Sequence, residues 1–479
     1  MDEEPEVLDL PVGIGETGHR RESDSMGVIH VPADRYWGAQ TQRSLLHFGD
    51  IGDDLMPREV YHAFGYVKKA AALANGQAGR LPAWMAGLIA RVCDEVIAGE
   101  LDEHFPLRVW QTGSGTQTNM NVNEVISNRA IQLTGGEIGS KTPVHPNDHV
   151  NMGQSSNDVF PSAVHIAATE ALERDLLPAL EALEAALAAR AKAFDHVIKI
   201  GRTHLQDAVP IRLGQEFSGY TEMASNAARR VRSAVHVVSQ LPLGGTAVGT
   251  GLGAKPDFAP RVIGIVAREI GIQLCQAPNL FEALAARDGL VEASGALRAA
   301  AVSLTKIAND VRWLGSGPRC GLGEIFIPDL QPGSSIMPGK VNPVMSEMLL
   351  MICAQVVGAD ATIAWGGAVG GNFELNTMVP VMAYNLLNAT AILANGCRLF
   401  ASRCIEGLEA DVDRCQGHIE QSLAMVTALV PRIGYDAAAA IAHDAVKTGK
   451  TVRQLCVERQ VLPADELDRL LDPRAMTGP

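Results

Sequence analysis

Apolar residues recur at the three-and-four spacing of one helix face over several long segments of the chain. In the segment 280–314, which contains no proline, this face is formed by Leu290, Ala293, Leu297, Ala301, Leu304 and Ile307. A similar pattern covers the segments 163–197, 214–241, 343–363 and 380–400. Heptads are not strict, so the sequence predicts a soluble bundle of about five long helices rather than a coiled coil.

The long helices are apolar on more than one face. One face can pack within the subunit and another against a second chain, so we expect an obligate oligomer. The acidic segment 1–20, which contains Pro and Gly, is expected to be a disordered extension. After about Asp411 the pattern changes to short helices, which indicates a small C-terminal domain.

Composition is consistent with a helical, globular protein. The chain has 479 residues, of which 47% are hydrophobic and only 5% aromatic, and this favours Ala/Leu-packed helices over sheets. Its length predicts about two to four domains. The net charge of −14, without a basic patch, argues against nucleic acid as a partner. A small anionic substrate remains compatible, because a few local cations can outweigh the net charge.

The cysteines and the N-terminus bear on the compartment. The eight cysteines are scattered and form no C-x-x-C pair, so neither a structural zinc nor an iron–sulfur cluster is predicted. We expect reduced core cysteines in a cytoplasmic protein. The acidic N-terminus lacks the apolar core of a signal peptide. No apolar run of about 18 residues is expected, so no membrane span is predicted.

Four polar segments stand out from the Ala/Leu background, and the first covers residues 110–124. Two glycines allow close backbone approach, and a helix is expected to begin near Thr116. Three asparagines at alternate positions are poor interior helix formers and need partners, unless they are simply surface residues of a capped helix. The hydroxyl and amide groups of interest are those of Ser114, Thr116, Asn119, Asn121 and Asn123.

The second polar segment covers residues 145–158. His145 and His149 have a metal-like spacing, but Pro146 argues against a shared helix face, so no metal site is predicted. Three residues before the next helical tract form an N-cap signal and also offer hydroxyl and amide donors to an anion at a positive helix end. Capping alone is the alternative for this group, which consists of Ser155, Ser156 and Asn157.

The third polar segment, 201–210, is expected to be a short polar loop between two long helices. It places Thr203 beside His204. A lone histidine is more often structural than catalytic, but a position in a polar loop beside a threonine hydroxyl makes both roles reasonable.

The fourth polar segment, 333–343, resembles a phosphate-binding loop only superficially. Five residues separate its outer glycines, where that loop has four, and valine follows Lys340 where Ser or Thr is required. Asn342 and Pro343 form a good N-cap and N1 pair, so Lys340 and Asn342 would lie at a helix N-terminus that favours a carboxylate. A capped surface loop is the alternative, but it does not explain Lys340 together with two adjacent serines.

Together these segments resemble the fumarase/aspartase superfamily. The segment 333–343 matches the superfamily signature. Three other segments are similar to the iron-free (class II) fumarases: 36–42, 110–121 and 315–324. The segment 201–207 occurs in fumarases and also in some aspartases. The resemblance runs from about Ser23 to about Met476.

The resemblance implies an all-α fold of three domains. These would be an N-terminal domain over 21–152, a central helical bundle over 153–411 and a small C-terminal domain over 412–479. It also implies a homotetramer whose central helices form one shared core, with each active site built from three subunits. Neither a metal nor another cofactor is implied.

The reaction implied by the resemblance is the reversible addition of water to fumarate, giving (S)-malate through an aci-carboxylate carbanion. Ser334 would be the carbon base, and His204 paired with Glu347 would handle the proton of water. The dicarboxylate substrate would be bound by Ser114, Thr116, Ser155, Ser156, Asn157, Thr203, Ser335, Lys340 and Asn342. A second anion site, outside the catalytic centre, would be formed by His145, Asn147 and Asp148.

Two alternatives remain open at this stage. An aspartase would add or remove ammonia instead of water, and the segments similar to class II fumarases argue against it. A non-catalytic member, like the lens crystallins of the superfamily, is disfavoured because the proposed chemical groups are all present: Ser334, His204, Lys340, Asn342 and Glu347.

Overall fold

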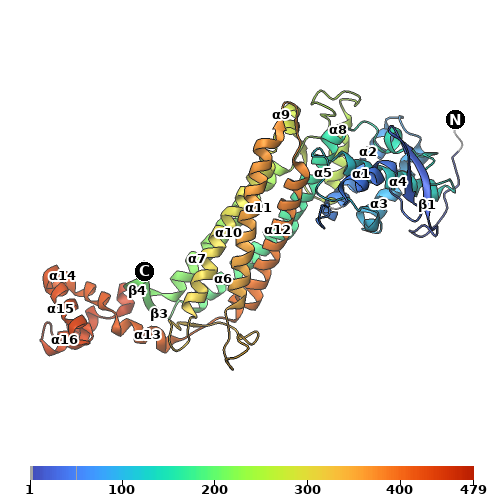
Figure 1. Cartoon of the computed structure of the whole chain (residues 1–479). Coiled ribbons are helices and arrows are strands. Elements are labelled where there is room, and N and C mark those ends of the chain that lie inside the picture. Colours follow the sequence, from blue (N-terminus) through green and yellow to red (C-terminus); the bar gives the residue numbers. More distant parts are fainter. Residues whose placement is uncertain (1–3, 50, 479) are drawn as a thin grey trace. The chain divides into compact units, whose positions relative to one another are not determined.

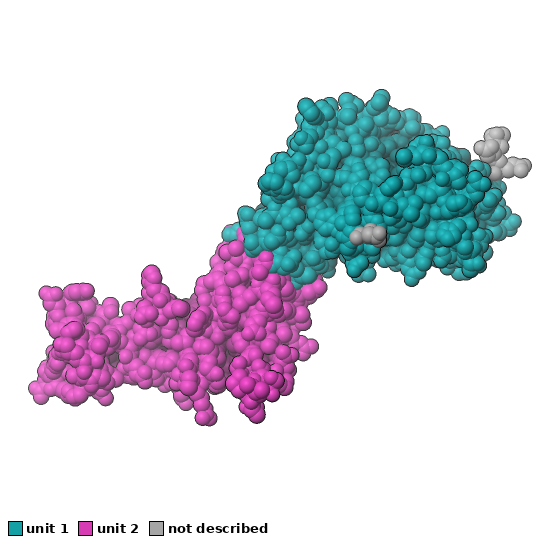
Figure 2. Space-filling view, viewed as in Figure 1, with its two compact units in different colours: residues 1–177, 230–298, 355–392 teal, residues 178–229, 299–354, 393–479 magenta. Residues whose placement is uncertain are grey.

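The computed structural model describes residues 4–49 and 51–478. The chain divides into two compact units: residues 1–177, 230–298 and 355–392 form the first, and residues 178–229, 299–354 and 393–479 form the second (Figure 2). Five of the long helices have residues in both units. The compact units therefore divide the chain differently from the three expected domains, and the domain boundaries stay a prediction.

The five long helical tracts expected from the apolar pattern are present (Figure 1). They are α5 and α6 (Ser156–Glu170 and Leu177–Ala193), α7 (Leu213–Val238), α10 (Asp288–Leu314), α11 (Val344–Gly370) and α12 (Val379–Arg403). A π-helical turn over Ala171–Leu176 joins α5 to α6 just before Pro178. The predicted apolar face of α10 is confirmed, because all six of its residues are buried.

The first unit is built around α2 (Arg58–Gln77), which packs against α3 (Ala83–Ile97), α5 and α8 (Phe258–Ile270). The helices α1 (Ala39–Phe48) and α4 (Thr116–Leu133) also belong to this unit. Its short elements are β1 (His19–Asp24), β2 (Gly27–Pro32), β5 (Gln240–Leu241), β6 (Cys275–Gln276), α9 (Leu280–Ala285), β8 (Gly371–Asn372) and β9 (Leu375–Asn376).

The segment before β1 is held against α4 over part of its length. The backbone N–H of Leu8 donates to the carbonyl of Leu133 (2.7 Å). The buried guanidinium of Arg129 donates to the carbonyls of Leu10 (2.8 Å) and Pro11 (3.1 Å). The expectation that residues 1–20 are disordered is therefore wrong for this stretch, because a buried guanidinium needs these acceptors. Residues 1–3 lie outside the described residues.

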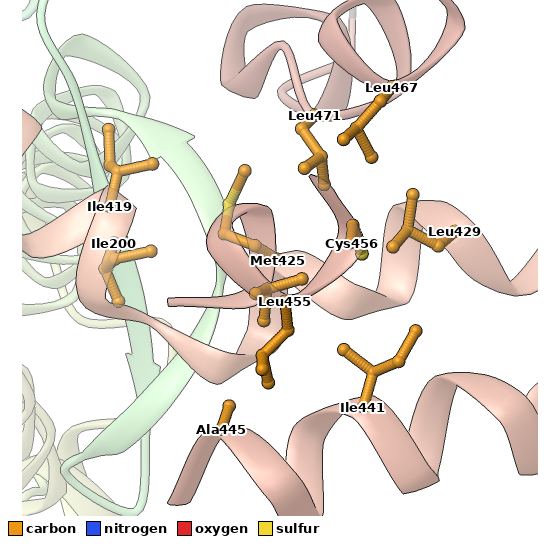
Figure 3. Close-up of a cluster of buried hydrophobic side chains, with 11 residues drawn as sticks. Ile200, Ile419, Met425, Leu429, Ile441, Ala445, Leu455, Cys456, Leu467 and Leu471 are labelled. Carbon is orange, nitrogen blue, oxygen red and sulfur yellow. The ribbon is translucent and has the colours of Figure 1, made fainter. Parts of the chain in front are cut away.

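The second unit ends in short helices, as the sequence predicts. They are α13 (Val412–Gln421), α14 (Val430–Ile433), α15 (Tyr435–Thr448), α16 (Val452–Glu458) and α17 (Ala464–Leu470). A small sheet pairs β7 (Ile325–Phe326) with β10 (Glu409–Ala410). The short helices share a buried apolar cluster that also includes Ile200, a residue far earlier in the chain (Figure 3).

The segment 201–210 corrects the prediction of a polar loop between helices. It belongs to a β-hairpin in which β3 (Ile198–Thr203) pairs antiparallel with β4 (Gln206–Arg212). Ile200 of β3 packs into the apolar cluster of the C-terminal helices, which gives one face of the strand a buried contact. The fold is therefore mostly helical rather than all-α, and the exception carries the histidine of interest.

The helix α11 corrects the expectation that the chain lacks an apolar run of about 18 residues. An 18-residue window of α11 has a mean hydropathy of 1.6, and by length and composition alone the helix could cross a membrane. Only 33% of this window is buried within the chain. Met351, Val357 and Trp365 are exposed. Apolar surface of this extent on a bundle helix calls for cover by a partner.

Candidate active site

The loop before α4 is shaped by two glycines that bring a pair of hydroxyls to the helix N-terminus. A Cβ on Gly113 would lie 1.4 Å from the carbonyl oxygen of Thr377, so no other residue fits there. Gly115 has φ +70° and faces the ring of Phe160, which a Cβ would meet at 2.3 Å. Ser114 lies between these glycines and Thr116 follows them. Their hydroxyl oxygens lie 2.9 Å apart.

The N-terminus of α5 is closed by a capping box. The hydroxyl of Ser155 accepts from the backbone N–H of Asn157 (3.3 Å), and the carboxylate of Asp158 accepts from the backbone N–H of Ser155 (2.9 Å). The other oxygen of Asp158 accepts from the N–H groups of Gly244 and Thr246. The predicted cap is confirmed. The side chain of Ser156 takes no part in this capping box.

Asn119 joins these two polar segments. Its side-chain amide donates to the hydroxyl of Ser156 (3.0 Å) and to the side-chain oxygen of Asn151 (3.2 Å). Its own side-chain oxygen accepts from the ammonium of Lys68 (2.7 Å). Asn121 and Asn123 are likewise fully buried, so the alternative of surface asparagines is wrong. Asn119 of the first segment therefore joins the hydroxyl of Ser156 in the second segment to Lys68, within the first unit.

The predicted histidine lies at the tip of the β3–β4 hairpin in the second unit. His204 and Leu205 form a two-residue turn with φ of 57° and 60°, between the paired residues Thr203 and Gln206. Positive φ is costly for residues of this size, so the surrounding structure must hold the turn. Thr203 and His204 are both exposed at the tip.

The base of this hairpin is anchored by a buried carboxylate. Glu324 is 0% exposed and receives two hydrogen bonds from the guanidinium of Arg202 (2.8 and 3.0 Å). It also lies 3.3 Å from the ammonium of Lys199 and 3.1 Å from Nδ1 of His418. Burial alone would raise the pKa of Glu324, but the hydrogen bond from Arg202 and the positive charge of Lys199 outweigh burial and lower it.

The loop 333–343 precedes α11 and is closed on itself. The N–H of Gly333 donates to the carbonyl of Lys340 (2.7 Å), and the side-chain amide of Asn342 donates to the carbonyl of Gly333 (2.8 Å). The hydroxyl of Ser334 accepts from the backbone N–H groups of Ile336 (3.3 Å) and Met337 (3.0 Å). The helix begins at Val344, so the predicted N-cap at Asn342 with Pro343 as the first helical residue is one residue too early. The side-chain amide of Asn342 closes the loop instead of capping the helix.

A cavity of about 680 Å³ opens beside this loop in the second unit. Lys340 and Asn342 line it together with Trp313, Ser316 and Ile325. Lys340 is exposed and Glu347 is exposed on the first turn of α11. The loop thus presents a cation, an amide and a helix N-terminus to a space large enough for a small acid.

The residues predicted for a second anion site lie on a π-helical turn over Pro146–Val150. Nδ1 of His145 accepts from the N–H groups of Asn147 (3.1 Å) and Asp148 (3.2 Å), and Nδ1 of His149 accepts from the N–H of His145 (2.9 Å). The two imidazole rings therefore stabilise the turn by accepting backbone hydrogen bonds. Among residues 4–49 and 51–478, no group of three or more His, Cys, Asp or Glu side chains could hold a metal ion.

A separate cavity of about 290 Å³ adjoins Asn147 in the first unit. It is lined by Lys141 but also by Glu22, Asp24 and Glu124. Burial raises the pKa of Glu124 to about 7, although hydrogen bonds from the N-terminus of α1 oppose this effect. Three carboxyl groups make this cavity itself unfavourable for an anion, so an anion near His145 would have to bind outside it.

Two known protein families match this chain. A family described as "Lyase" matches residues 27–358, and one described as "Fumarase C C-terminus" matches residues 425–478. The fold and the polar segments thus define a lyase built on long helices. A fumarate hydratase class II from Methanosarcina acetivorans is 54% identical over 474 residues, covering 99% of this chain and 98% of the relative. The chain belongs to the class II fumarate hydratase family.

Two further relatives extend this similarity. A mitochondrial fumarate hydratase from Saccharomyces cerevisiae is 51% identical over 461 residues, which cover 96% of this chain and 94% of the relative. The crystal structure of a class II fumarase from Schistosoma mansoni superimposes with a TM-score of 0.93 at 40% identity, covering 96% of this chain and 99% of that one. The similarity therefore includes the whole fold.

The predicted site residues fall into two sets, one in each compact unit. The first set lies around Asn119 and contains Ser114, Thr116, Ser155, Ser156 and Asn157, and the second contains Thr203, His204, Ser334, Ser335, Lys340, Asn342 and Glu347. Sequence reasoning missed Lys68 and Glu324 as supports of these sets. Lys68 could have been noticed because it occupies the apolar stripe of α2, four residues after the buried Phe64.

Proposed function

We infer that the chain catalyses the reversible hydration of fumarate to (S)-malate. The observation that carries this inference is the near full-length identity to fumarate hydratases, combined with an intact loop 333–343 at the N-terminus of α11. The substrate is a small dicarboxylate, and the reaction class is that of a hydro-lyase.

The difficult step in the malate direction is removal of a proton from the carbon next to a carboxylate. The resulting carbanion is held as an aci-carboxylate, whose negative charge lies on the carboxylate oxygens. Lys340, Asn342 and the N-terminus of α11 would bind these oxygens, and such preorganised donors are the main means of stabilising developing charge. The chemistry uses groups of the chain itself and needs no cofactor.

Ser334 is proposed as the carbon base. A hydroxyl is a weak base unless its alkoxide is stabilised. The backbone N–H groups of Ile336 and Met337 both donate to its oxygen, and they would stabilise a negative charge there. The exposed ammonium of Lys340 in the same loop adds to this effect.

His204 is proposed to move the proton of the water, with Glu347 as its partner in the assembled site. An unperturbed imidazole titrates at about 6.5, which suits acid–base chemistry near neutral pH. A neighbouring carboxylate would stabilise the imidazolium and orient the ring. The strained turn would hold the imidazole at the hairpin tip, where a substrate can reach it.

The remaining polar side chains are proposed to bind the substrate carboxylates by hydroxyl and amide hydrogen bonds. They are Ser114, Thr116, Ser155, Ser156, Asn157, Thr203 and Ser335. The turn with His145, Asn147 and Asp148 is proposed as a second anion site outside the catalytic centre. Soaking crystals with a dicarboxylate tests this second site, and an empty turn at every concentration would refute it.

We propose that the protein is a homotetramer of three-domain subunits, with each active site assembled from three chains. The exposed apolar surface of α11 supports an assembly in which such helices form a shared core. The distribution of the site residues over two compact units is consistent with such sharing. We also place the protein in the cytoplasm as a non-membrane enzyme, supported by eight free cysteines, six of them buried.

One assay tests the proposed reaction. Malate and then aspartate are supplied with a chelator present, and fumarate is followed by its ultraviolet absorbance. Fumarate from malate only, at a rate that the chelator leaves unchanged, is the expected result. Fumarate from aspartate would instead identify an aspartase, and no fumarate from either substrate would indicate a non-catalytic member.

A further inference from the structure

Lys68 is a fully buried lysine on α2 without a carboxylate in hydrogen-bonding contact. Its side chain is 0% exposed. The ammonium donates to three amide oxygens, those of Asn119 (2.7 Å), Gln154 (2.9 Å) and Asn151 (3.0 Å). It also lies 5.6 Å from the centre of the Phe64 ring. Neutral acceptors therefore satisfy its hydrogen bonds but leave its charge unbalanced.

The titratable groups that face Lys68 accept no hydrogen bond from it. Asp158 on α5 and Cys93 on α3 act on it only through space. The carboxylate of Asp158 is already occupied by backbone N–H groups of residues 155, 244 and 246. Burial lowers the pKa of Lys68 to about 7. A buried cation without a paired anion is costly, so its position needs a reason beyond stability.

The position of Lys68 supplies that reason. Asn119 accepts from Lys68 with its oxygen and donates to the hydroxyl of Ser156 with its nitrogen, so one amide links the cation to the substrate-binding segment. Ser156 is the first residue of α5, and Thr116 is the first residue of α4. The ammonium is thus linked through Asn119 to Ser156 at the N-terminus of α5, a positive helix end that carries proposed substrate-binding groups.

We propose that Lys68 is a positioning residue whose charge strengthens the binding of one substrate carboxylate at Ser156 and whose hydrogen bond to Asn119 orients that hydroxyl. The proposal rests on the proposed function, because it takes a dicarboxylate as the ligand. The substrate carboxylate would add a second negative charge near Lys68, beside that of Asp158.

This arrangement couples substrate binding to a proton. A bound dianion favours the charged form of Lys68, so the enzyme takes up a proton at this residue when it binds substrate above neutral pH. A purely structural lysine would show no such coupling. A measurement of proton uptake therefore distinguishes a role of Lys68 in substrate binding from a purely structural role.

The test compares Lys68→Met, which removes the charge and leaves an unbranched side chain one atom shorter, with Lys69→Met. Lys69 is adjacent on α2, but its ammonium is paired with Asp94 (2.7 Å) and Glu269 (2.6 Å). KM and kcat for malate are measured for both variants. We expect Lys68→Met to raise KM about tenfold with a smaller change in kcat, and Lys69→Met to change KM less than about twofold.

Proton uptake is measured by calorimetry of succinate binding at pH 8, in two buffers with different enthalpies of ionisation. Wild-type protein should take up more protons per bound succinate than Lys68→Met, whereas Lys69→Met should match the wild type. If Lys68→Met does not fold, Lys68→Gln replaces it in the same comparison, because His204 could also take up a proton in the wild type. An absence of uptake overturns the proposal.

The possible failures are distinguishable. If wild-type protein does not convert malate to fumarate, the proposed function is wrong. If it converts malate but the Lys68 variants keep the wild-type KM and proton uptake, only the role of Lys68 is wrong.

Discussion

Arg202 and Glu324 form a bidentate ion pair, with N···O distances of 2.8 and 3.0 Å, only two residues before the turn that carries His204. The carboxylate of Glu324 is completely buried, so the ion pair fixes the base of the hairpin, while the tip of the hairpin is exposed. The rigidity of the histidine turn therefore depends on a residue more than a hundred positions away in sequence.

Replacing Glu324 with glutamine should loosen this hairpin. The substitution leaves Lys199 and Arg202 without their shared carboxylate, and breaking a buried pair costs about 3–5 kcal/mol. We expect a lower thermal stability and a lower kcat for malate. The control is Asp195→Asn, which breaks the exposed pair between Asp195 and Arg212 of the same hairpin and should change stability by less than about 1 kcal/mol. Equal effects of the two substitutions would refute the anchoring role.

Ser334→Ala removes the proposed carbon base without altering the loop backbone. Because Gly333, Lys340 and Asn342 hold the loop closed through contacts that do not involve this hydroxyl, the variant should keep its assembly. Malate dehydration should fall by at least about 100-fold. Steady-state kinetics and size-exclusion chromatography check the two expectations, and near-normal dehydration would remove Ser334 from the mechanism.

His204→Asn removes the imidazole and is expected to leave the hairpin turn in place. Asparagine adopts positive φ more readily than most residues, so the hairpin should keep its conformation. We expect turnover to fall by about 100- to 10,000-fold and its pH profile to change. Leu205→Asn tests the neighbouring turn position and should retain activity. An unchanged rate and pH profile in His204→Asn would contradict the proton-transfer role.

The buried ammonium of Lys68 predicts a pH dependence of stability. Its pKa is lowered from 10.5 to about 7 in the folded chain, so between these values the unfolded state binds more protons. Wild-type protein should therefore gain stability relative to Lys68→Met as pH rises above 7, by at most about 1.4 kcal/mol per pH unit. Thermal unfolding of both proteins between pH 6 and pH 9 measures this difference, and parallel curves would contradict a lowered pKa.

The exposed apolar surface of α11 predicts that charge on this helix prevents assembly. Met351 is 68% exposed and Trp365 is 65% exposed. If the proposed tetramer buries this surface, Met351→Glu and Trp365→Glu should each reduce assembly and activity, because a buried unpaired carboxylate is unfavourable in a subunit interface. Val446→Glu on α15 places the same charge at a residue that is 66% exposed and should leave assembly unchanged. Light scattering and malate turnover give the readout.

The features predicted correctly from sequence are those set by local physics. The apolar face of α10 follows from helical periodicity, and the cap of α5 follows from hydrogen bonds between Ser155 and Asp158, three residues apart. The sequence indicates the two polar segments joined by Asn119 separately, because each is rich in polar residues within an Ala/Leu-rich chain. Their contact through Ser156 became visible only in three dimensions.

The features that sequence reasoning missed depend on distant partners. β3 is short and contains Gly201, and it is a strand because β4 pairs with it and the C-terminal helices cover Ile200. The position of Lys68 on the apolar stripe of α2 indicates burial, but its three amide acceptors come from segments far along the chain and are visible only in the fold. The apolar character of α11 was underestimated because Glu347 and Asp360 interrupt its sequence at long intervals.

The participation of Ile200 in the C-terminal cluster has a consequence for biosynthesis. β3 and β4 emerge from the ribosome long before the helices that provide Ile419, Leu455 and Leu471. The hairpin can pair early, but one face of it stays uncovered until translation is almost complete. We therefore expect His204, the proposed proton-transfer residue, to be among the last parts of the subunit to reach its final position. A nascent or prematurely terminated chain would carry this residue without the packing that supports its hairpin.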